Sequence, residues 1–572
     1  MKRATSSQSP KSWRVELRGL PWTVKGGELF QLKSGEKRFA QKAVEGAATA
    51  HFGKVKFIRK FILGTVRLTL PCTRTEESHE MTRNTEADSA APAPQSVGLT
   101  AGAVVPLCVD MDGTLVKSDT FYDSLCLLLR HRPSAFLRLP GWLAGGKARV
   151  KAEVAALAPL DASRLPYNEP LLDYLREEKL KGRSIYLATG ADLSLAGRVA
   201  SHLGFFDGIL GSDGTRNLTG SRKLAELQER FFGFDYIGNA AIDLPLLVES
   251  EQPLVANPSR ALLRGMRRRE LTPARTFIDR KSHFAAVLKA IRLHQWAKNV
   301  LLFVPLLLSH KISWHSAVTV IAAFFCFSFV ASANYVMNDL LDIESDRQHV
   351  KKRFRPFAAG DLPVLTGVGL ALLLVAASCA LLPWLPIEFA SWLLFYAVVT
   401  STYSLILKRI PLVDVLVLSG LYALRILAGA AATRTPVSPW LLSFAIFLFL
   451  SLAMAKRFSE LATLRELGAT TTHGRGYRVS DLEQIRSFGT ASAYASVVVF
   501  SLYIFLPDVE ALYHHSVRLW LIVPFMLYWL NRVWLLASRG ELDEDPVIFA
   551  LRDKVSLGIG LCIAILAVFA AL

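Results

Sequence analysis

Paired cysteines are missing from this sequence. Its six cysteines are scattered over 572 residues with no CxxC pair and no nearby histidine pattern, which argues against a disulfide framework and against a zinc site. Charged residues are scarce as well, at 20%, whereas 52% of the residues are hydrophobic. That composition excludes a disordered or fibrous protein and is too apolar for an ordinary soluble enzyme.

The start of the chain also lacks the apolar run of about 7–15 residues that a secretory signal needs. Residues 1–80 instead carry 16 Lys or Arg against 7 Asp or Glu, which accounts for half of the net charge of +18. Much of the remaining positive charge lies in short loops between hydrophobic stretches, where basic residues orient membrane proteins, so no nucleic acid partner is expected. We expect residues 1–100 to be a basic segment and a disordered linker, with Met81 as an alternative start of the chain.

The remainder divides into an α/β region and a membrane region. Apolar strands are expected at residues 104–109, 184–188 and 234–237, separated by helical stretches, which predicts a parallel sheet over residues 101–255. Residues 256–284 are expected to be a basic linker, and residues 285–572 an all-α membrane bundle. The predicted fold is therefore a Rossmann-like α/β domain, with a helical cap at residues 118–180, joined to that bundle.

Nine membrane spans are predicted from the apolar runs. They lie at residues 299–309 (extended back through 288–298), 318–337, 365–385, 389–407, 411–432, 441–455, 491–506, 519–536 and 555–572. Most Lys and Arg residues of the loops follow the even-numbered spans. By the positive-inside rule these loops and the α/β domain are cytoplasmic, and the C-terminus faces outward.

Two carboxylates, Asp110 and Asp112, directly follow the first apolar strand. In a parallel sheet this edge is where ligands bind. Two acids so close together invite a divalent cation: one carboxylate can attack phosphorus while the other transfers a proton to the leaving oxygen, and Mg²⁺ offsets their mutual repulsion.

The run Asp110–Thr114 resembles the DxDGT signature of the haloacid dehalogenase superfamily, and later segments follow in the matching order. The resemblance implies that Thr189 binds phosphate, that Lys223 stabilises it, and that Asn239 and Asp243 complete the Mg²⁺ site. The resemblance leads us to expect an acid at position 239, so the neutral Asn239 weakens the expected Mg²⁺ site. A domain that keeps the fold without turnover is the alternative.

Three acids, Asp339, Asp342 and Asp346, close the second span. Their spacing of three, four and seven residues places them on one face of a helix. Such crowding destabilises an empty helix and opposes its dipole, whereas Mg²⁺ binds one or two carboxylates together with substrate phosphate oxygens. We therefore predict that these acids hold Mg²⁺ on a phosphorylated substrate.

A cationic turn at residues 351–360 follows these acids. The run NDxxDxxxD followed by RPxxxG resembles the UbiA superfamily of polyprenyl transferases over about residues 285–572. Members that act on aromatic acceptors usually carry a second DxxxD run between spans six and seven, where this chain has a basic loop beginning at Lys456 and Arg457. With residues 292–299 and 403–408, that loop resembles the decaprenyl-phosphate phosphoribosyltransferase branch, which implies a phosphoribosyl pyrophosphate donor and a lipid phosphate acceptor.

The residues expected to bind these substrates are mostly polar or cationic. They are Lys298, Asn338, Lys352, Arg353, Arg355, Tyr403, Lys408, Arg425, Lys456, Arg457 and Glu460. Arg425 lies about 20 Å along its span at 1.5 Å per residue, so we expect it to face the bundle interior and meet a lipid phosphate or an acid. Asp414 is either a metal or ribose ligand or an acid at a helix N-terminus, and Arg552 and Asp553 are secondary candidates.

The sequence predicts a Mg²⁺-dependent membrane transferase that joins a phosphoribosyl group to a polyprenyl phosphate. A fused cytoplasmic phosphatase domain would remove the 5-phosphate of the product. Two alternatives remain: prenylation of an aromatic or other small acceptor by a polyprenyl diphosphate, and a non-enzymatic membrane anchor for a phosphatase. No pattern in the sequence indicates the oligomeric state.

Overall fold

The computed structural model describes residues 12–17, 20–25, 105–310, 312–466, 468, 476–507, 509, 513, 515–542 and 545–572. The chain forms two compact units, residues 1–98 and 99–572. In the first unit, strands β1 (Ser12–Leu17) and β2 (Leu20–Lys25) pair antiparallel. The predicted linker before residue 100 and the alternative start at Met81 lie outside the described residues.

The α/β region of the second unit is built on a six-stranded sheet with the strand order β5-β4-β3-β6-β7-β8. All neighbouring strands pair in parallel. The strands are β3 (Leu107–Val109), β4 (Ile185–Asp192), β5 (Gly208–Ser212), β6 (Asp235–Gly238), β7 (Pro253–Ala256) and β8 (Arg275–Phe277). Every residue of β3 and β6 is buried, as expected of central strands in a parallel sheet. The predicted parallel α/β fold is confirmed.

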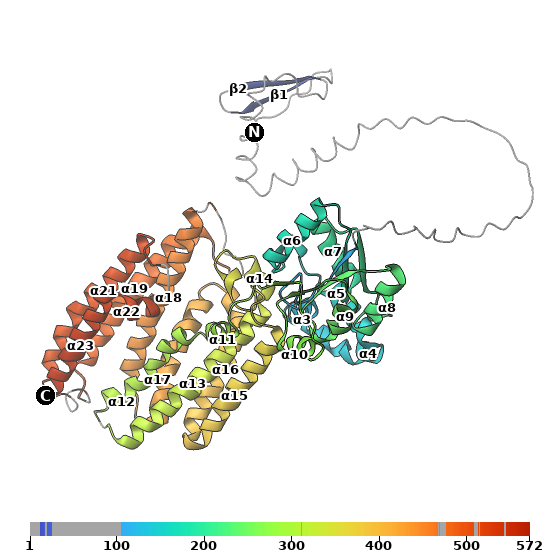
Figure 1. Ribbon diagram of the computed structural model, residues 1–572. Helices are drawn as coiled ribbons and strands as arrows, with labels where there is room; N and C mark the ends of the chain where they lie inside the picture. Colours follow the sequence, from blue (N-terminus) through green and yellow to red (C-terminus); the bar gives the residue numbers. More distant parts are fainter. Residues whose placement is uncertain are drawn as a thin grey trace, which may run out of the picture. The chain divides into compact units, whose positions relative to one another are not determined.

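Helices surround this sheet (Figure 1). The predicted cap segment is helical and holds α3 (Thr120–His131), η1 (Pro133–Arg138), α4 (Leu139–Ala144), α5 (Gly146–Leu157), η2 (Ala162–Arg164) and α6 (Glu169–Leu180). Later helices are α7 (Leu193–Leu203), α8 (Ser221–Arg230), η3 (Ala241–Asp243), α9 (Leu244–Glu249) and α10 (Arg260–Arg268). Asp119 caps the N-terminus of α3, because its side chain accepts hydrogen bonds from the backbone amides of Phe121 and Tyr122.

Residues 256–284 are not a linker, contrary to the sequence prediction. They contain α10 and β8, and β8 pairs with β7 as the edge strand of the sheet. The five Arg residues between 260 and 269 suggested a solvated connection. Instead, Leu262 and Met266 anchor one face of α10 in the core while the arginines line its exposed face.

Long apolar helices follow the α/β region. Their bounds are α11 (His283–Ile291), η4 (Leu293–Phe303), α12 (Val304–Leu308), α13 (Trp314–Leu341), α14 (Ile343–Arg347), η5 (Lys352–Phe354), α15 (Val364–Leu381), η6 (Leu382–Trp384), α16 (Ile387–Leu405), η7 (Leu407–Arg409), α17 (Val413–Thr433), α18 (Pro439–Glu466), η8 (Val479–Asp481), α19 (Leu482–Tyr503), η9 (Ser516–Leu521), α21 (Ile522–Ser538), α22 (Pro546–Arg552) and α23 (Lys554–Ala571).

Among the described residues, seven helices are long and apolar enough to cross a membrane. They include α13, α15, α17, α18, α19, α21 and α23, some of them extended by a short 3₁₀ turn. The predicted span at residues 389–407 corresponds to α16, which is not among these seven helices. The predicted first span is broken into α11, η4 and α12, because Arg292 adopts a left-handed conformation and ends α11.

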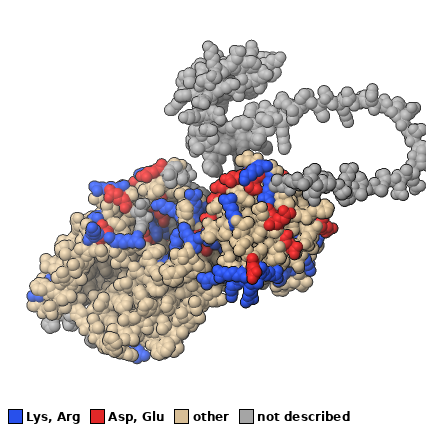
Figure 2. Space-filling model, in the orientation of Figure 1, with Lys and Arg blue, Asp and Glu red and all other residues tan. Residues whose placement is uncertain are grey.

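The helical region is a multi-pass membrane bundle. Charged side chains gather at one end of it, while the rest of the visible surface is almost free of charge (Figure 2). Large apolar side chains such as Leu372, Leu373 and Leu394 are exposed on its helices. A lipid environment accommodates such a surface, whereas water does not.

The bundle is tightly packed where α17 meets η4. A Cβ atom at Gly429 would lie 2.1 Å from the backbone carbonyl oxygen of Leu302. A backbone atom cannot yield as a flexible side chain does, so only glycine fits there.

We expect Gly429→Ala to destabilise the bundle by about 1–3 kcal/mol, because the added methyl group must push η4 away from α17. Thermal unfolding of the detergent-solubilised protein measures this loss. Gly420→Ala is the matched control on the same helix, since nothing lies within 4 Å of a Cβ atom at that position. Equal melting temperatures of the two variants would contradict the close contact.

Candidate active sites

The first site lies at the carboxyl end of β3, where Asp110 and Asp112 follow the strand as predicted. Lys223 of α8 donates a hydrogen bond of 2.7 Å to Asp110 Oδ1. Burial raises the pKa of Asp110 to about 7, although Lys223 opposes this shift. Burial lowers the pKa of Lys223, but Asp110 and Asp243 outweigh it, so the pKa lies above its usual value. The structure therefore brings a buried carboxylate and a cationic lysine together.

Asp112 faces the start of the cap. Its Oδ1 accepts hydrogen bonds from the backbone amide of Thr120 at 2.8 Å and from the Thr120 hydroxyl at 2.7 Å. Burial, followed by the charge of Asp119, raises the pKa of Asp112 to about 7. A carboxyl group that titrates near neutrality is suited to exchange a proton with a leaving oxygen.

The two residues expected to complete the metal site, Asn239 and Asp243, lie in the same loop after β6. Asp243 Oδ2 accepts backbone amides from Asn239 and Ala240 at 3.2 and 3.0 Å, and its Oδ1 accepts from Tyr236 at 3.2 Å. Asp243 therefore orders the loop that carries Asn239. The Asn239 side chain lies against Gly113, whose φ of +77° keeps the DxDGT turn free of a Cβ atom.

Thr189 is buried within β4, and its hydroxyl oxygen accepts a hydrogen bond of 3.0 Å from the backbone amide of Ala191. The sequence analysis missed Lys151 of α5. Its Nζ donates to the carbonyl oxygen of Gly190 at 2.6 Å, beside Thr189, and Asp112 and Asp119 act on it electrostatically. Lys151 lies in a cap helix, and no sequence motif or spacing relates it to the residues of this site.

The second site lies where α13 gives way to α14. Asp339 is 2% exposed, and Arg292 holds both of its oxygens at 2.5 and 2.8 Å. Arg355 Nη1 donates to Asp339 at 3.0 Å and to Asp346 at 2.7 Å, so one guanidinium bridges two of the predicted acids. Burial raises the pKa of Asp346, which lies outside the spans, to about 6.

Asp342 turns toward other cations. It lies at a one-residue turn between α13 and α14, and its oxygens contact Lys408 at 3.1 Å and Arg130 of α3 at 3.2 Å. Within the described part of the chain, no three acids, histidines or cysteines are grouped as a metal site. The three-acid cluster expected from the helical spacing is thus divided into Asp339 with Asp346, and Asp342 apart.

The geometry of Asp339 and Asp346 nevertheless fits Mg²⁺. Both carboxylates accept a hydrogen bond from Nη1 of Arg355, so their oxygens point toward one position. Mg²⁺ is typically bound by one or two carboxylates together with substrate phosphates. At the first site the donor set is weaker, because Asp243 is engaged by its own loop and Asn239 is neutral.

Most of the remaining predicted residues belong to three groups of polar contacts. Arg457 joins Asp414 at 2.6 Å, Glu460 at 2.8 Å and Tyr403 at 3.3 Å. Asp414 also accepts a hydrogen bond from Tyr477. Asp414 is therefore a fully buried acid in the first turn of α17 that is already paired with a cation.

Lys298 and Lys456 meet at Asp545, with distances of 2.7 and 3.0 Å. Arg425 faces the bundle interior, as predicted, where it donates to Asn299 at 2.9 Å and Tyr396 at 3.2 Å. The expected acid partner of Arg425 is replaced by an amide and a phenol.

Asn338, Lys352 and Arg353 lie around the acids. The carbonyl oxygen of Asn338 accepts the amide of Asp342, and Arg353 stacks over the ring of Phe354. Lys352 is exposed in η5. Of the secondary candidates, Asp553 caps α23 and pairs with Arg532.

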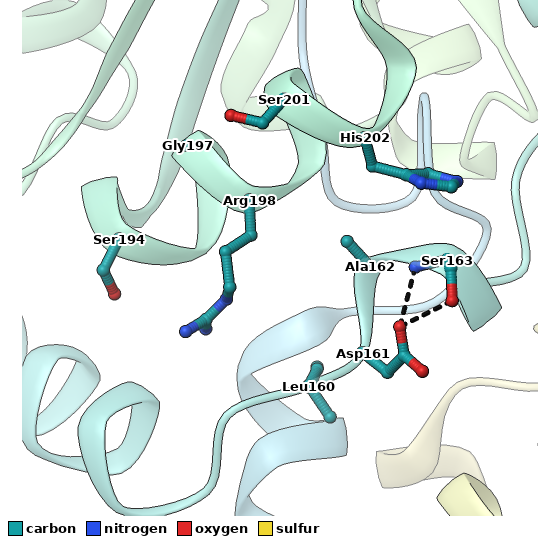
Figure 3. A pocket seen from close by; sticks show the side chains of 9 residues that line it. All are labelled: Leu160, Asp161, Ala162, Ser163, Ser194, Gly197, Arg198, Ser201 and His202. Atoms are coloured by element: carbon teal, nitrogen blue, oxygen red, sulfur yellow. Dashed lines mark hydrogen bonds between the residues drawn. The ribbon is translucent and has the colours of Figure 1, made fainter. Parts of the chain in front are cut away.

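A surface hollow of about 610 Å³ lies between α7 and η2 (Figure 3). Arg198 projects into it and Asp161 forms hydrogen bonds with Ser163. None of the predicted site residues lines this hollow, so it does not belong to either site.

Comparison with known proteins gives the following relationships. The UbiA prenyltransferase family matches residues 300–568. Protein y4nM of Sinorhizobium fredii is 40% identical over 465 residues, which cover 80% of this chain and 90% of that protein. Decaprenyl-phosphate phosphoribosyltransferase of Mycobacterium tuberculosis is 34% identical over 276 residues, 47% of this chain and 89% of that protein.

Two solved structures resemble the two halves. A UbiA homologue from Archaeoglobus fulgidus, bound to GPP and Mg²⁺, is 16% identical with a TM-score of 0.38, and covers 50% of this chain and 98% of that chain. A HAD family hydrolase from Salmonella enterica serovar Typhi is 16% identical with a TM-score of 0.22, and covers 28% of this chain and 66% of that chain.

We expect Asn239→Asp to strengthen Mg²⁺ binding at the first site by about tenfold, because a second negative ligand would join Asp110. Calorimetric titration of the full-length protein with Mg²⁺ measures the change. The background must be Asp339→Asn in both proteins, so that the second site contributes little. An unchanged or weaker affinity would show that residue 239 does not face the ion.

Proposed function

The chain belongs to the UbiA prenyltransferase family, and on that basis we propose that its membrane half joins a polyprenyl phosphate to the phosphoribosyl group of phosphoribosyl pyrophosphate. The observation that carries this proposal is the set of cations on the acids of the second site. Arg292 and Arg355 form ion pairs with Asp339, and Lys408 forms an ion pair with Asp342. A donor with a diphosphate and a further phosphate needs several cations close to the acids that would hold the metal ion.

The relationship to the mycobacterial phosphoribosyltransferase supports this choice of donor and acceptor, because its 34% identity extends over 89% of that protein. The basic pair Lys456 and Arg457 supports it too. Both contact acids of the membrane half, Asp545 and Asp414, at a place where aromatic prenyltransferases would have a second acidic run. This difference argues against the alternative of an aromatic acceptor.

In the proposed reaction, a phosphate oxygen of the lipid attacks C1 of the ribose, the C1–oxygen bond to diphosphate breaks, and diphosphate leaves. Arg292, Arg355 and Lys408 stabilise the charge that develops on the leaving group, which requires no nucleophilic side chain. Mg²⁺, held by Asp339 and Asp346, would act as a Lewis acid on the diphosphate oxygens. Each guanidinium nitrogen of the buried Arg425 donates a hydrogen bond within the bundle, so we assign Arg425 to the packing of the bundle interior rather than to the phosphate.

The α/β half is proposed to remove the 5-phosphate from the lipid product. Asp110 would attack phosphorus, Asp112 would exchange the proton, and Lys223 with Thr189 would hold the phosphate. The bond from phosphorus to the 5-oxygen breaks as Asp110 attacks, and the polyprenyl-phosphoryl pentose leaves with a proton from Asp112. Water then hydrolyses the aspartyl phosphate and releases inorganic phosphate. Tethering both sites to one chain, on the cytoplasmic face, raises the effective concentration of the intermediate.

The transferase is tested with the purified protein, a polyprenyl phosphate and phosphoribosyl pyrophosphate labelled in the ribose. The wild type should form a labelled lipid, and Asp339→Asn should lower the rate by about 10²–10³-fold, because a preorganised charge is lost from the leaving-group site. Glu388→Gln, an exposed acid in the first turn of α16, is the matched control. Absence of labelled lipid with the wild type would refute the transferase proposal.

The phosphatase is tested with Asp110→Asn. This variant should accumulate the phosphorylated form of the lipid, because the nucleophile is gone, while the rate of transfer stays within about twofold. Mass spectrometry of the labelled lipid separates the two forms. If wild type and variant yield the same phosphorylated lipid, the α/β half does not process this product.

A further inference from the structure

A side chain of the α/β region reaches the acids at the end of α13. Arg130 Nη2 lies 3.2 Å from Asp342 Oδ1, and the two side chains are only 11% and 12% exposed. The other oxygen of Asp342 contacts Lys408 at 3.1 Å. Asp342 is therefore held between one cation from each half of the protein.

The helical spacing of α3 explains why Arg130 points toward the bundle. Tyr122, Cys126 and Arg130 are four residues apart and so lie on one face of the helix. Tyr122 and Cys126 pack against an apolar cluster of the membrane half that contains Leu340 and Phe357. The packing of Tyr122 and Cys126 against this cluster places Arg130, one turn further along α3, next to the acids.

A buried ion pair fixes α3 in this position. Arg347 Nη2 lies 2.7 Å from Asp123 Oδ2, and these side chains are 2% and 1% exposed. The same guanidinium donates to Ser118 at 3.0 Å and to the carbonyl oxygen of Ala358 at 3.1 Å. Because Arg347 directly follows Asp346, this pair ties the cap to the acidic segment itself.

The loop after the acids also fits closely to the α/β half. A Cβ atom at Gly360 would lie 2.7 Å from Cβ of Lys117. Only glycine permits this approach, and its φ of +73° permits the turn. The position of Arg130 is thus set by contacts on both sides of the acids.

We propose that Arg130 completes the donor site of the transferase and binds the diphosphate of the incoming donor. Three carboxylates are in direct contact with four cations: Arg292, Arg355, Lys408 and Arg130. Without Arg130 the positive and negative charges are equal. Arg130 therefore supplies the positive charge in excess, and its guanidinium can bind a phosphate group through two hydrogen bonds.

This inference rests on the proposed function of the membrane half and deepens it. The α/β half then has two roles: it contains the phosphatase site, and it contributes Arg130 to the donor site of the transferase. Donor affinity then depends on the docking of the cap against the membrane half.

The test compares Arg130→Ala and Arg130→Lys in the full-length protein. Arg132→Ala is the matched control, because Arg132 is an exposed arginine two residues further along. We expect Arg130→Ala to raise the KM for phosphoribosyl pyrophosphate by about tenfold and leave the KM for polyprenyl phosphate unchanged. Arg130→Lys should recover part of the loss, because it restores the charge but not the planar fork.

Two further measurements separate binding from docking. Hydrolysis of p-nitrophenyl phosphate by the α/β half should be the same in all variants, and calorimetry should show about tenfold weaker binding of pyrophosphate with Mg²⁺ in Arg130→Ala. An unchanged donor KM and pyrophosphate affinity in Arg130→Ala would overturn the inference. If Arg130→Ala also raises the KM for polyprenyl phosphate and lowers the phosphatase rate, the inference is overturned as well, because these changes would indicate a purely structural contact.

The pyrophosphate measurement also distinguishes this inference from the proposed function. If the wild type forms no ribosylated lipid, the proposed function fails. A weaker pyrophosphate affinity of Arg130→Ala would even then support the role of Arg130 in binding a diphosphate.

Discussion

Three neighbouring carboxylates at the charged end of the membrane bundle must be neutralised, and this requirement determines how that end is built. A buried charge without a partner costs several kcal/mol, so Asp339, Asp342 and Asp346 must be paired. Their partners come from segments far apart in the chain: the junction of α11 and η4, the loop after α14, the turn η7, and α3 of the α/β half. Charge pairing thus determines where these segments meet, and it produces a site rich in cations.

The same cations suit two states of the site. In the free protein they satisfy the carboxylates, and Arg355 lies between Asp339 and Asp346. In the proposed complex, Mg²⁺ would take over the two carboxylates, and the freed guanidinium groups would bind phosphate oxygens. A site built in this way is stable without substrate, and it exchanges one set of charge-assisted hydrogen bonds for another when the donor binds.

The sequence predicted what depends on local spacing. The parallel sheet and the DxDGT turn follow from an apolar strand with two acids directly after it. The pairing of the acids could not be predicted, since Arg130 and Asp342 belong to different halves of the chain. The left-handed Arg292 that breaks the first span and the edge strand hidden in an arginine-rich segment escaped prediction as well, because tertiary contacts outweigh local composition at both places.

The central claim is that Asp339 and Asp346 hold a divalent cation on a diphosphate. A crystal or cryo-EM structure of the protein with Mn²⁺ and pyrophosphate tests it most directly, with anomalous scattering to locate the ion in a crystal. The account predicts Mn²⁺ between these two carboxylates, with Arg355 moved onto the pyrophosphate. Pyrophosphate bound elsewhere, or Asp339 and Asp346 still bridged by Arg355 with no ion between them, would contradict it.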